Sequence, residues 1–187
     1  MEITLLRHGR PELISNSSIS ARELSNWIAQ YNKSGISTIE SPSEECIRCA
    51  EGAGIIVSST LTRSIKSAEL LHTDQKRISD RIFAEAGLPF AEWSKIKLTP
   101  KYWAVFFRAL WFFGYSNNSE SYTESKERAA QASQKLVEHA IMHHSVLFVG
   151  HGIFNRLIAK QLKEQGWFGP RNPGSNYWEF GTYKKST

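Results

Sequence analysis

The chain has 187 residues, of which 41% are hydrophobic and 22% charged, and its formal net charge is +5. These values are ordinary for a globular domain, exclude a wholly disordered chain, and allow a hydrophobic core without disulfides or a structural metal. The basic balance favours anionic partners, but no run of lysines and arginines typical of a nucleic-acid-binding arm is present, so we expect no nucleic-acid partner.

We expect neither a secretion signal nor a membrane span. The start, Met1–Gly9, reaches charge after a few apolar residues, and the longest apolar stretch, Tyr102–Phe113, contains Arg108 and is too short to cross a bilayer. Two cysteines, Cys46 and Cys49, are too few for a disulfide framework. The sequence therefore predicts a cytoplasmic protein without a membrane partner, in which this C-x-x-C lies on a structural helix.

Short apolar runs alternate with helical patterns along the chain. Three runs are expected to be buried strands: Ile3–Leu6, Gly54–Ser58 and Val146–Val149. Helices are expected after the capping box Ser20–Glu23, around the two cysteines, over Thr62–His72, after Thr99, and over Ser121–His144 and Ile153–Lys163. This alternation predicts a single α/β domain over residues 1–187, a three-layer α/β/α sandwich with a mainly parallel central sheet.

Basic side chains follow each of the three predicted strands. Arg7 and His8 follow the first, Arg63 lies just past the second at the start of a helix, and His151 follows the third. Ligands of such sheets bind beyond the carboxyl ends of the strands. Glycines beside both histidines let the backbone approach a ligand closely, and helix starts supply free N–H groups for an anion. The sequence thus predicts an anion site at this edge of the sheet.

The ordered set "LLRHG", "SSTLTRSIKSAE" and "VGHG" resembles the histidine phosphatase superfamily, the branch that contains cofactor-dependent phosphoglycerate mutase and small bacterial phosphatases. The resemblance runs from Ile3 to about Phe180 and is loose in the middle. It implies a phosphoglycerate mutase-like fold and a phosphatase that hydrolyses a phosphomonoester through a phosphohistidine on His8. No metal or other cofactor is expected, because arginines supply the positive charge.

The resemblance also implies a role for each site residue. Arg7, Arg63 and His151 would hold the phosphoryl oxygens, for which guanidinium groups are suited by their bidentate geometry. Their proximity should lower the pKa of His8 and keep it nucleophilic. Glu85 matches the position of the family's acid and would protonate the leaving alcohol, then activate water. A solvated glutamate in a polar loop is the other interpretation.

The dipeptide Arg10-Pro11 departs from the family pattern, which usually has an acidic or polar residue and then threonine. Pro11 has no N–H to donate, so one contact to phosphate is lost. Arg10 could replace that contact, recognise a second anionic group, or be an ordinary surface cation. Asn16 is the nearest match to an asparagine that family members commonly carry soon after this loop.

The aromatic segment Tyr102–Tyr115 is apolar nearly all round, which leaves two interpretations open. It is either a buried core helix or part of an insertion, around residues 86–120, that forms a cap over the site. In the second case its exposed aromatic side would meet an apolar substrate or a partner subunit.

Three histidines, His139, His143 and His144, have spacing that suggests a metal pair. They fall at the end of a long helix without a third ligand nearby, so we expect no metal there. For the site near His8, a mutase and a non-catalytic phosphate-binding regulator remain alternatives to a phosphatase; the short chain favours hydrolysis. The substrate, a small phosphorylated molecule or a phosphoprotein, and the oligomeric state are left open by the sequence.

Overall fold

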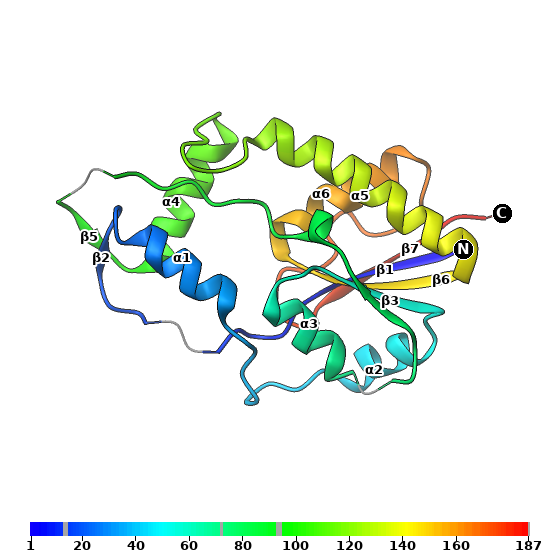
Figure 1. The fold of residues 1–187 in the computed structure, drawn as a ribbon. Coiled ribbons are helices and arrows are strands. Elements are labelled where there is room, and N and C mark those ends of the chain that lie inside the picture. The colour runs from blue at the N-terminus through cyan, green and yellow to red at the C-terminus, as the bar shows by residue number, and fades with distance from the viewer. Residues whose placement is uncertain (13–14, 72, 93–94, 187) are drawn as a thin grey trace.

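A five-stranded sheet forms the centre of the computed structural model, which describes residues 1–12, 15–71, 73–92 and 95–186. Its strand order is β4-β3-β6-β1-β7 (Figure 1). The strands are β1 (Glu2–Arg7), β3 (Ile55–Ser58), β4 (Arg77–Ser79), β6 (Ser145–Gly150) and β7 (Phe180–Lys184). The first four pair in parallel, and β7 runs antiparallel to β1. The three predicted strands are confirmed as its central members.

Helices cover both faces of the sheet (Figure 1). On one face lie α5 (Tyr122–His143) and α6 (Gly152–Glu164), and on the other lie α2 (Glu44–Glu51) and α3 (Thr62–Glu69). Strand side chains alternate between two hydrophobic clusters, so that Ile3 and Leu5 belong to the first and Leu6 to the second. The predicted α/β sandwich with a mainly parallel sheet is therefore confirmed.

Two helix boundaries differ from those expected. Ser20 and Glu23 form the two hydrogen bonds of a capping box, at 2.8 and 3.3 Å, yet α1 (Leu24–Lys33) begins only after Glu23. The reason is that Ser20 belongs to the short strand β2 (Ile19–Ser20), and a turn separates it from the helix. The helix expected over Thr62–His72 is α3, which ends at Glu69, and His72 lies outside the described residues.

A small outer layer lies beyond the carboxyl ends of β1, β3 and β6 (Figure 1). It consists of α1, α4 (Pro100–Phe112) and a ribbon formed by β2 with β5 (Lys97–Leu98). Its own hydrophobic cluster contains Ala21, Leu24, Ala91, Trp103 and Phe107. The aromatic segment is thus buried along one side of α4, whereas its other side, with Tyr102, Val105 and Phe112, is exposed.

No helix in the described part of the chain is long and apolar enough to cross a membrane. The two cysteines lie on α2 as free thiols, Cys46 buried and Cys49 half-buried. The Cys46 thiol donates to the backbone oxygen of Trp178 at 3.1 Å. Burial raises the pKa of both thiols, which disfavours the reactive thiolate form.

Candidate active site

The register of the sheet brings the two predicted site histidines together. Arg7 at the end of β1 pairs with Gly150 at the end of β6, so His8 and His151 are the next residues along two adjacent parallel strands. The His8 N–H donates to the Gly150 carbonyl at 3.0 Å, which extends the pairing by one step. The two imidazole rings consequently lie 5.0 Å apart, centroid to centroid, and both are buried.

Neighbouring groups determine the tautomer of His8. Its Nδ1 lies 2.7 Å from the carbonyl oxygen of Gly9, which can only accept, so Nδ1 carries the proton. On the other side, Nε of Arg63 donates to His8 Nε2 at 3.3 Å. Nε2 therefore carries the lone pair of the ring, and Nε2 is the ring atom that can attack an electrophile.

The charge state of His8 follows from its surroundings. Burial, followed by the positive charge of Arg63, lowers the pKa of His8 to about 3; the Gly9 carbonyl opposes this shift, and Arg7 adds to it. The imidazole is therefore neutral at pH 7 and retains its lone pair.

His151 is held by hydrogen bonds from two sides. Its Nε2 lies 2.6 Å from the Ser59 hydroxyl, and its backbone N–H donates to Asn155 Oδ1 at 3.0 Å. Asn155 in turn donates to the Leu6 carbonyl at 3.1 Å, which ties the start of α6 to β1. Burial, then the charges of His8 and the arginines, lowers the pKa of His151 well below its usual value. Nδ1 of this ring is buried without a partner among the described residues.

The two predicted arginines approach His8 from different elements. Arg63, on the first turn of α3, is only 1% exposed, and its Nη1 donates to the Tyr31 carbonyl at 3.1 Å and to Asn32 Oδ1 at 3.3 Å. The guanidinium of Arg7 donates to the Ser175 carbonyl and lies 4.4 Å from the centroid of the Tyr177 ring. Within the described residues its Nε is buried without a partner. Both cations are thus fixed in place with hydrogen-bonding capacity to spare.

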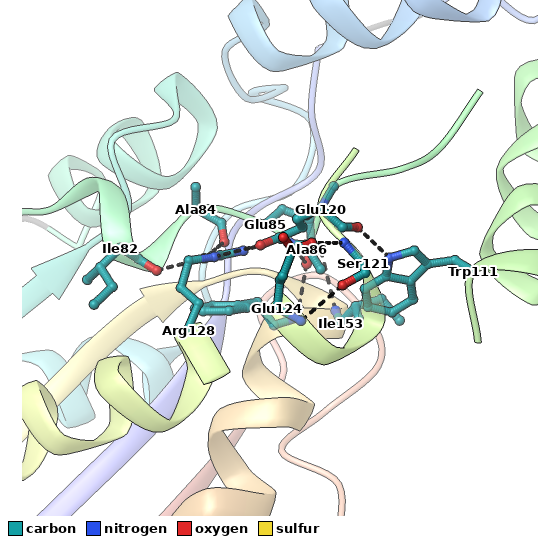
Figure 2. A network of polar contacts seen from close by, with 12 residues as sticks. Ile82, Ala84, Glu85, Ala86, Trp111, Glu120, Ser121, Glu124, Arg128 and Ile153 are labelled. Atoms are coloured by element: carbon teal, nitrogen blue, oxygen red, sulfur yellow. Dashed lines mark hydrogen bonds and ion pairs between the residues drawn. The ribbon is translucent and has the colours of Figure 1, made fainter. Parts of the chain in front are cut away.

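Glu85 follows the short 3₁₀ helix η1 (Arg81–Phe83) and lies at the start of α6 (Figure 2). Its Oε1 accepts from the N–H groups of Phe154 and Ala86, both at 2.9 Å, and its Oε2 from that of Ile153 at 3.4 Å. The first N–H groups of a helix have no intrahelical partner, so a carboxylate is well placed there. Glu85 is therefore a held side chain and not a freely solvated one.

A polar network supports the backbone on either side of Glu85 (Figure 2). Arg128, on α5, donates to the carbonyls of Ile82 at 2.7 Å and Ala84 at 2.8 Å and forms an ion pair with Glu120 at 2.5 Å. Glu120 also accepts from the N–H of Gly87 at 3.1 Å. The segment that carries Glu85 is thus fixed to α5 before and after that residue.

An open cavity of about 1530 Å³ lies between these residues and the outer layer. Arg7, Arg63 and Glu85 line it together with Tyr177, whose ring lies 5.8 Å from that of His8. The opposite wall comes from α1 and α4. The cavity is therefore cationic at the sheet edge and closed on the other side by the outer layer.

The family model of the histidine phosphatase superfamily (branch 1) matches residues 3–176. The chain belongs to the histidine phosphatase superfamily. No curated protein matches it in sequence.

Among solved structures, this superfamily member is similar to mycobacterial glucosyl-3-phosphoglycerate phosphatase in complex with VO3. The TM-score is 0.60 and the identity 17%, over 97% of this chain and 91% of that one. It is also similar to YhfR of Bacillus stearothermophilus, with a TM-score of 0.58 and 18% identity over 87% of this chain and 80% of that one. For an open reading frame product of Mycobacterium tuberculosis, the TM-score is 0.54 and the identity 19%, over 97% of this chain and 89% of that one. At these identities the likeness establishes the fold.

Two further predicted residues of this histidine phosphatase superfamily member are exposed, unlike the buried His8. Arg10 is exposed, forms an ion pair with Glu40 at 2.8 Å, and lies 5.8 Å from the centroid of Tyr177; its part in phosphate binding stays a prediction. Asn16 is exposed and lines the cavity. Among the described residues, including those around His139, no group of three or more His, Cys, Asp or Glu side chains could hold a metal.

Two of the glycines beside the histidines face protein side chains and not the space for a ligand, Gly150 those of Asn155 and Phe148, and Gly9 that of Trp178. A Cβ on Gly9 would lie 2.6 Å from the Trp178 ring, so glycine at this position makes room for an indole and not for a ligand. Gly152, in contrast, faces the Arg7 guanidinium, with which a Cβ would make ordinary contact at 3.5 Å.

Three contacts of the site were not predicted from the sequence: Ser59 with His151, Tyr31 with Arg63, and Tyr177 with Arg7. Ser59 lies directly after β3 and follows the same strand-end rule that located the histidines. Tyr31 and Tyr177 come from α1 and from the segment before β7, and no local pattern relates them to His8.

Proposed function

We propose that this chain is a metal-independent phosphatase that hydrolyses a phosphomonoester through a phosphohistidine on His8. The observation that carries the proposal is the pair of contacts on the His8 ring, which places the proton on Nδ1 and the lone pair on Nε2 beside Arg63. A neutral imidazole with this tautomer is a nucleophile directed at the position where two arginines can hold a phosphoryl group.

The reaction has two steps in this proposal. His8 Nε2 attacks phosphorus in line and the bond from phosphorus to the leaving oxygen breaks. Glu85, whose carboxylate accepts backbone N–H groups in the free protein, would have to carry a proton in the substrate complex and would give it to that oxygen. In the second step Glu85, now a carboxylate, takes a proton from water as the water attacks phosphorus. The bond from phosphorus to Nε2 breaks, inorganic phosphate leaves, and both residues return to their starting states.

Arg7, Arg63 and His151 would stabilise the three phosphoryl oxygens during both steps. Support comes from the buried donor atoms left without partners in the described part of the chain, namely Arg7 Nε and His151 Nδ1. If the Ser59 hydroxyl donates to His151 Nε2, the proton of that ring is on Nδ1 and is available to a phosphoryl oxygen. Donors fixed in advance lower the cost of stabilising charge in the transition state.

The outer layer would act as a cap on a single catalytic domain. Its segment 86–120 supplies much of the cavity wall opposite the sheet edge, through residues of α4 and the chain before it. A substrate bound between this cap and the sheet edge would displace water from the reacting group.

The direct test is phosphate release from a generic aryl phosphate with and without EDTA. We expect the wild type to be active in both conditions and His8→Ala to lose at least ~10³-fold in kcat/KM, since the nucleophile is gone. Full activity in His8→Ala would show that the nucleophile is another residue. Inactive wild-type protein that still binds phosphate would identify a regulator, and isomerisation of a phosphoglycerate without phosphate release would identify a mutase.

A further inference from the structure

The half of the cavity remote from His8 has an apolar wall. It is built by side chains from α1, α4 and the segment between Glu85 and α4: Trp27, Ile28, Leu88, Phe90, Ala104, Val105 and Phe112. Val105 is 64% exposed and Phe112 48% exposed although both are large and apolar. When a ligand covers exposed apolar surface in a concave site, the free energy of the complex is lowered.

A line of aromatic faces connects the cationic end of the cavity to this wall. The guanidinium of Arg63 lies 4.5 Å from the centroid of the Tyr31 ring. Tyr31 is stacked on Trp27 with a centroid distance of 5.1 Å and an angle of 11°. Because all three side chains line the cavity, a molecule whose phosphate lies beside Arg63 can extend along α1 toward the apolar wall.

Two arginines next to this wall are already engaged by the protein. The Arg108 guanidinium donates to the carbonyls of Gly87 at 3.0 Å and Ala86 at 2.9 Å and lies 4.5 Å from the Trp111 centroid. Arg128 is paired with Glu120. Neither arginine is free to recognise a second anionic group. Lys101 of α4 also lines the cavity and is exposed, so a substrate with a second phosphate is the alternative that the alkyl phosphate series has to exclude. The apolar side chains make apolar contact the main interaction that the wall offers.

From the wall and the aromatic line we propose that the substrate is a phosphomonoester with an extended apolar leaving group. This inference rests on the proposed phosphatase activity. The phosphate would lie at Arg7 and Arg63, and the apolar group would extend past Tyr31 and Trp27 to Val105 on α4.

A series of n-alkyl phosphates tests the inference, because their leaving alcohols have nearly the same acidity and differ only in apolar length. We expect kcat/KM of the wild type to rise about two- to fourfold for each added methylene until the wall is covered. Glycerol 1-phosphate is polar and of similar size to propyl phosphate, and it should be the poorer substrate of these two. A flat series, or preference for glycerol 1-phosphate or for a substrate with a second phosphate, would overturn the inference.

Two variants of α4 provide matched controls. Val105 and Tyr102 are both 64% exposed, but of these two only Val105 lines the cavity as the structure describes it. Val105→Asn should reduce kcat/KM for decyl phosphate about threefold to tenfold more than it reduces that for methyl phosphate, whereas Tyr102→Asn should alter neither. Equal effects of both variants would contradict the role given to the wall.

Calorimetric binding of the same alkyl phosphates separates this inference from the proposed function. If no phosphomonoester is turned over, the phosphatase proposal fails, and the dissociation constants alone report on the wall. Affinity that rises with chain length, and less so in Val105→Asn, would then support the apolar subsite; affinity independent of chain length would overturn it.

Discussion

Arg63 and Arg10 are two arginines near His8 with opposite surroundings. Arg63 is buried and donates to the nucleophile, whereas Arg10 is exposed and paired with Glu40. We predict that Arg63→Lys, which keeps the charge but loses the Nε donor and the bidentate geometry, lowers kcat/KM about 10²-fold or more. Arg10→Lys, the matched control, should change it less than about threefold, because exposed ion pairs contribute little. Steady-state kinetics on an aryl phosphate would measure both values of kcat/KM. Equal losses of kcat/KM in the two variants would show that Arg10 contributes to catalysis as much as Arg63 does.

Some residues of the site could be predicted from the sequence, and others could not. His8, Arg63 and His151 could be predicted, because each follows a strand and the ends of parallel strands meet at one sheet edge. The contacts of Tyr31 and Tyr177 could not, because they depend on how α1 and the segment before β7 fold back over that edge. The tautomer of His8 likewise depends on the carbonyl direction at Gly9, which no sequence pattern specifies.

At the scale of elements, Arg128 of α5 and Glu120, which lies just before that helix, fix the segment from Ile82 to Gly87 (Figure 2). We predict that Arg128→Met lowers the free energy of unfolding by about 1–3 kcal/mol, since it removes the ion-pair partner of Glu120 and the side-chain donor to the carbonyls of Ile82 and Ala84. It should also lower kcat on an aryl phosphate, because Glu85 loses its fixed position. Urea denaturation and kinetics would measure the two effects.

The control for this prediction is Lys135→Met, which removes the ion pair of Lys135 with Asp80 at 2.6 Å on the same helix. Both partners of that pair are partly exposed, so a loss below about 1 kcal/mol and unchanged kcat are expected. If Lys135→Met lowers kcat as much as Arg128→Met does, the network does not act specifically on Glu85.

The regular elements were largely predictable, whereas the outer layer was not. Buried strands and amphipathic helices follow from local periodicity, and β1, β3, β6, α5 and α6 lie within a few residues of their expected places. The two-residue strands β2 and β5 are too short to carry a periodic signal, and they pair in the layer where α1 and α4 pack together. The same packing decides which side of α4 is buried, and Trp103 and Phe107 lie on that side.

At the scale of the whole molecule, the buried histidines make stability depend on pH. The pKa of His8 is lowered to about 3 in the folded chain against 6.5 in the unfolded one, and that of His151 is also lowered. Below pH 6.5 the unfolded state therefore binds more protons, and stability falls with pH by about 1.4 kcal/mol per unit for each such histidine. Between pH 7 and pH 5 we expect His8 to account for a loss of about 2 kcal/mol.

Urea denaturation of the wild type and of His8→Asn at pH 7 and pH 5 would measure this contribution. The variant lacks one titrating group, so its loss of stability over this interval should be smaller than that of the wild type by about 2 kcal/mol. Equal losses in both proteins would mean that His8 is not neutral and buried as the site requires.

The most direct measurement of the central claim is the trapping of a phosphoenzyme. Wild-type protein mixed with an aryl phosphate and quenched in base should gain the mass of one phosphoryl group, and peptide mapping should place it on His8, because phosphohistidine survives base and is lost in acid. His8→Ala should gain none. Turnover by the wild type without such an intermediate, or a phosphoryl group on another residue, would contradict the account.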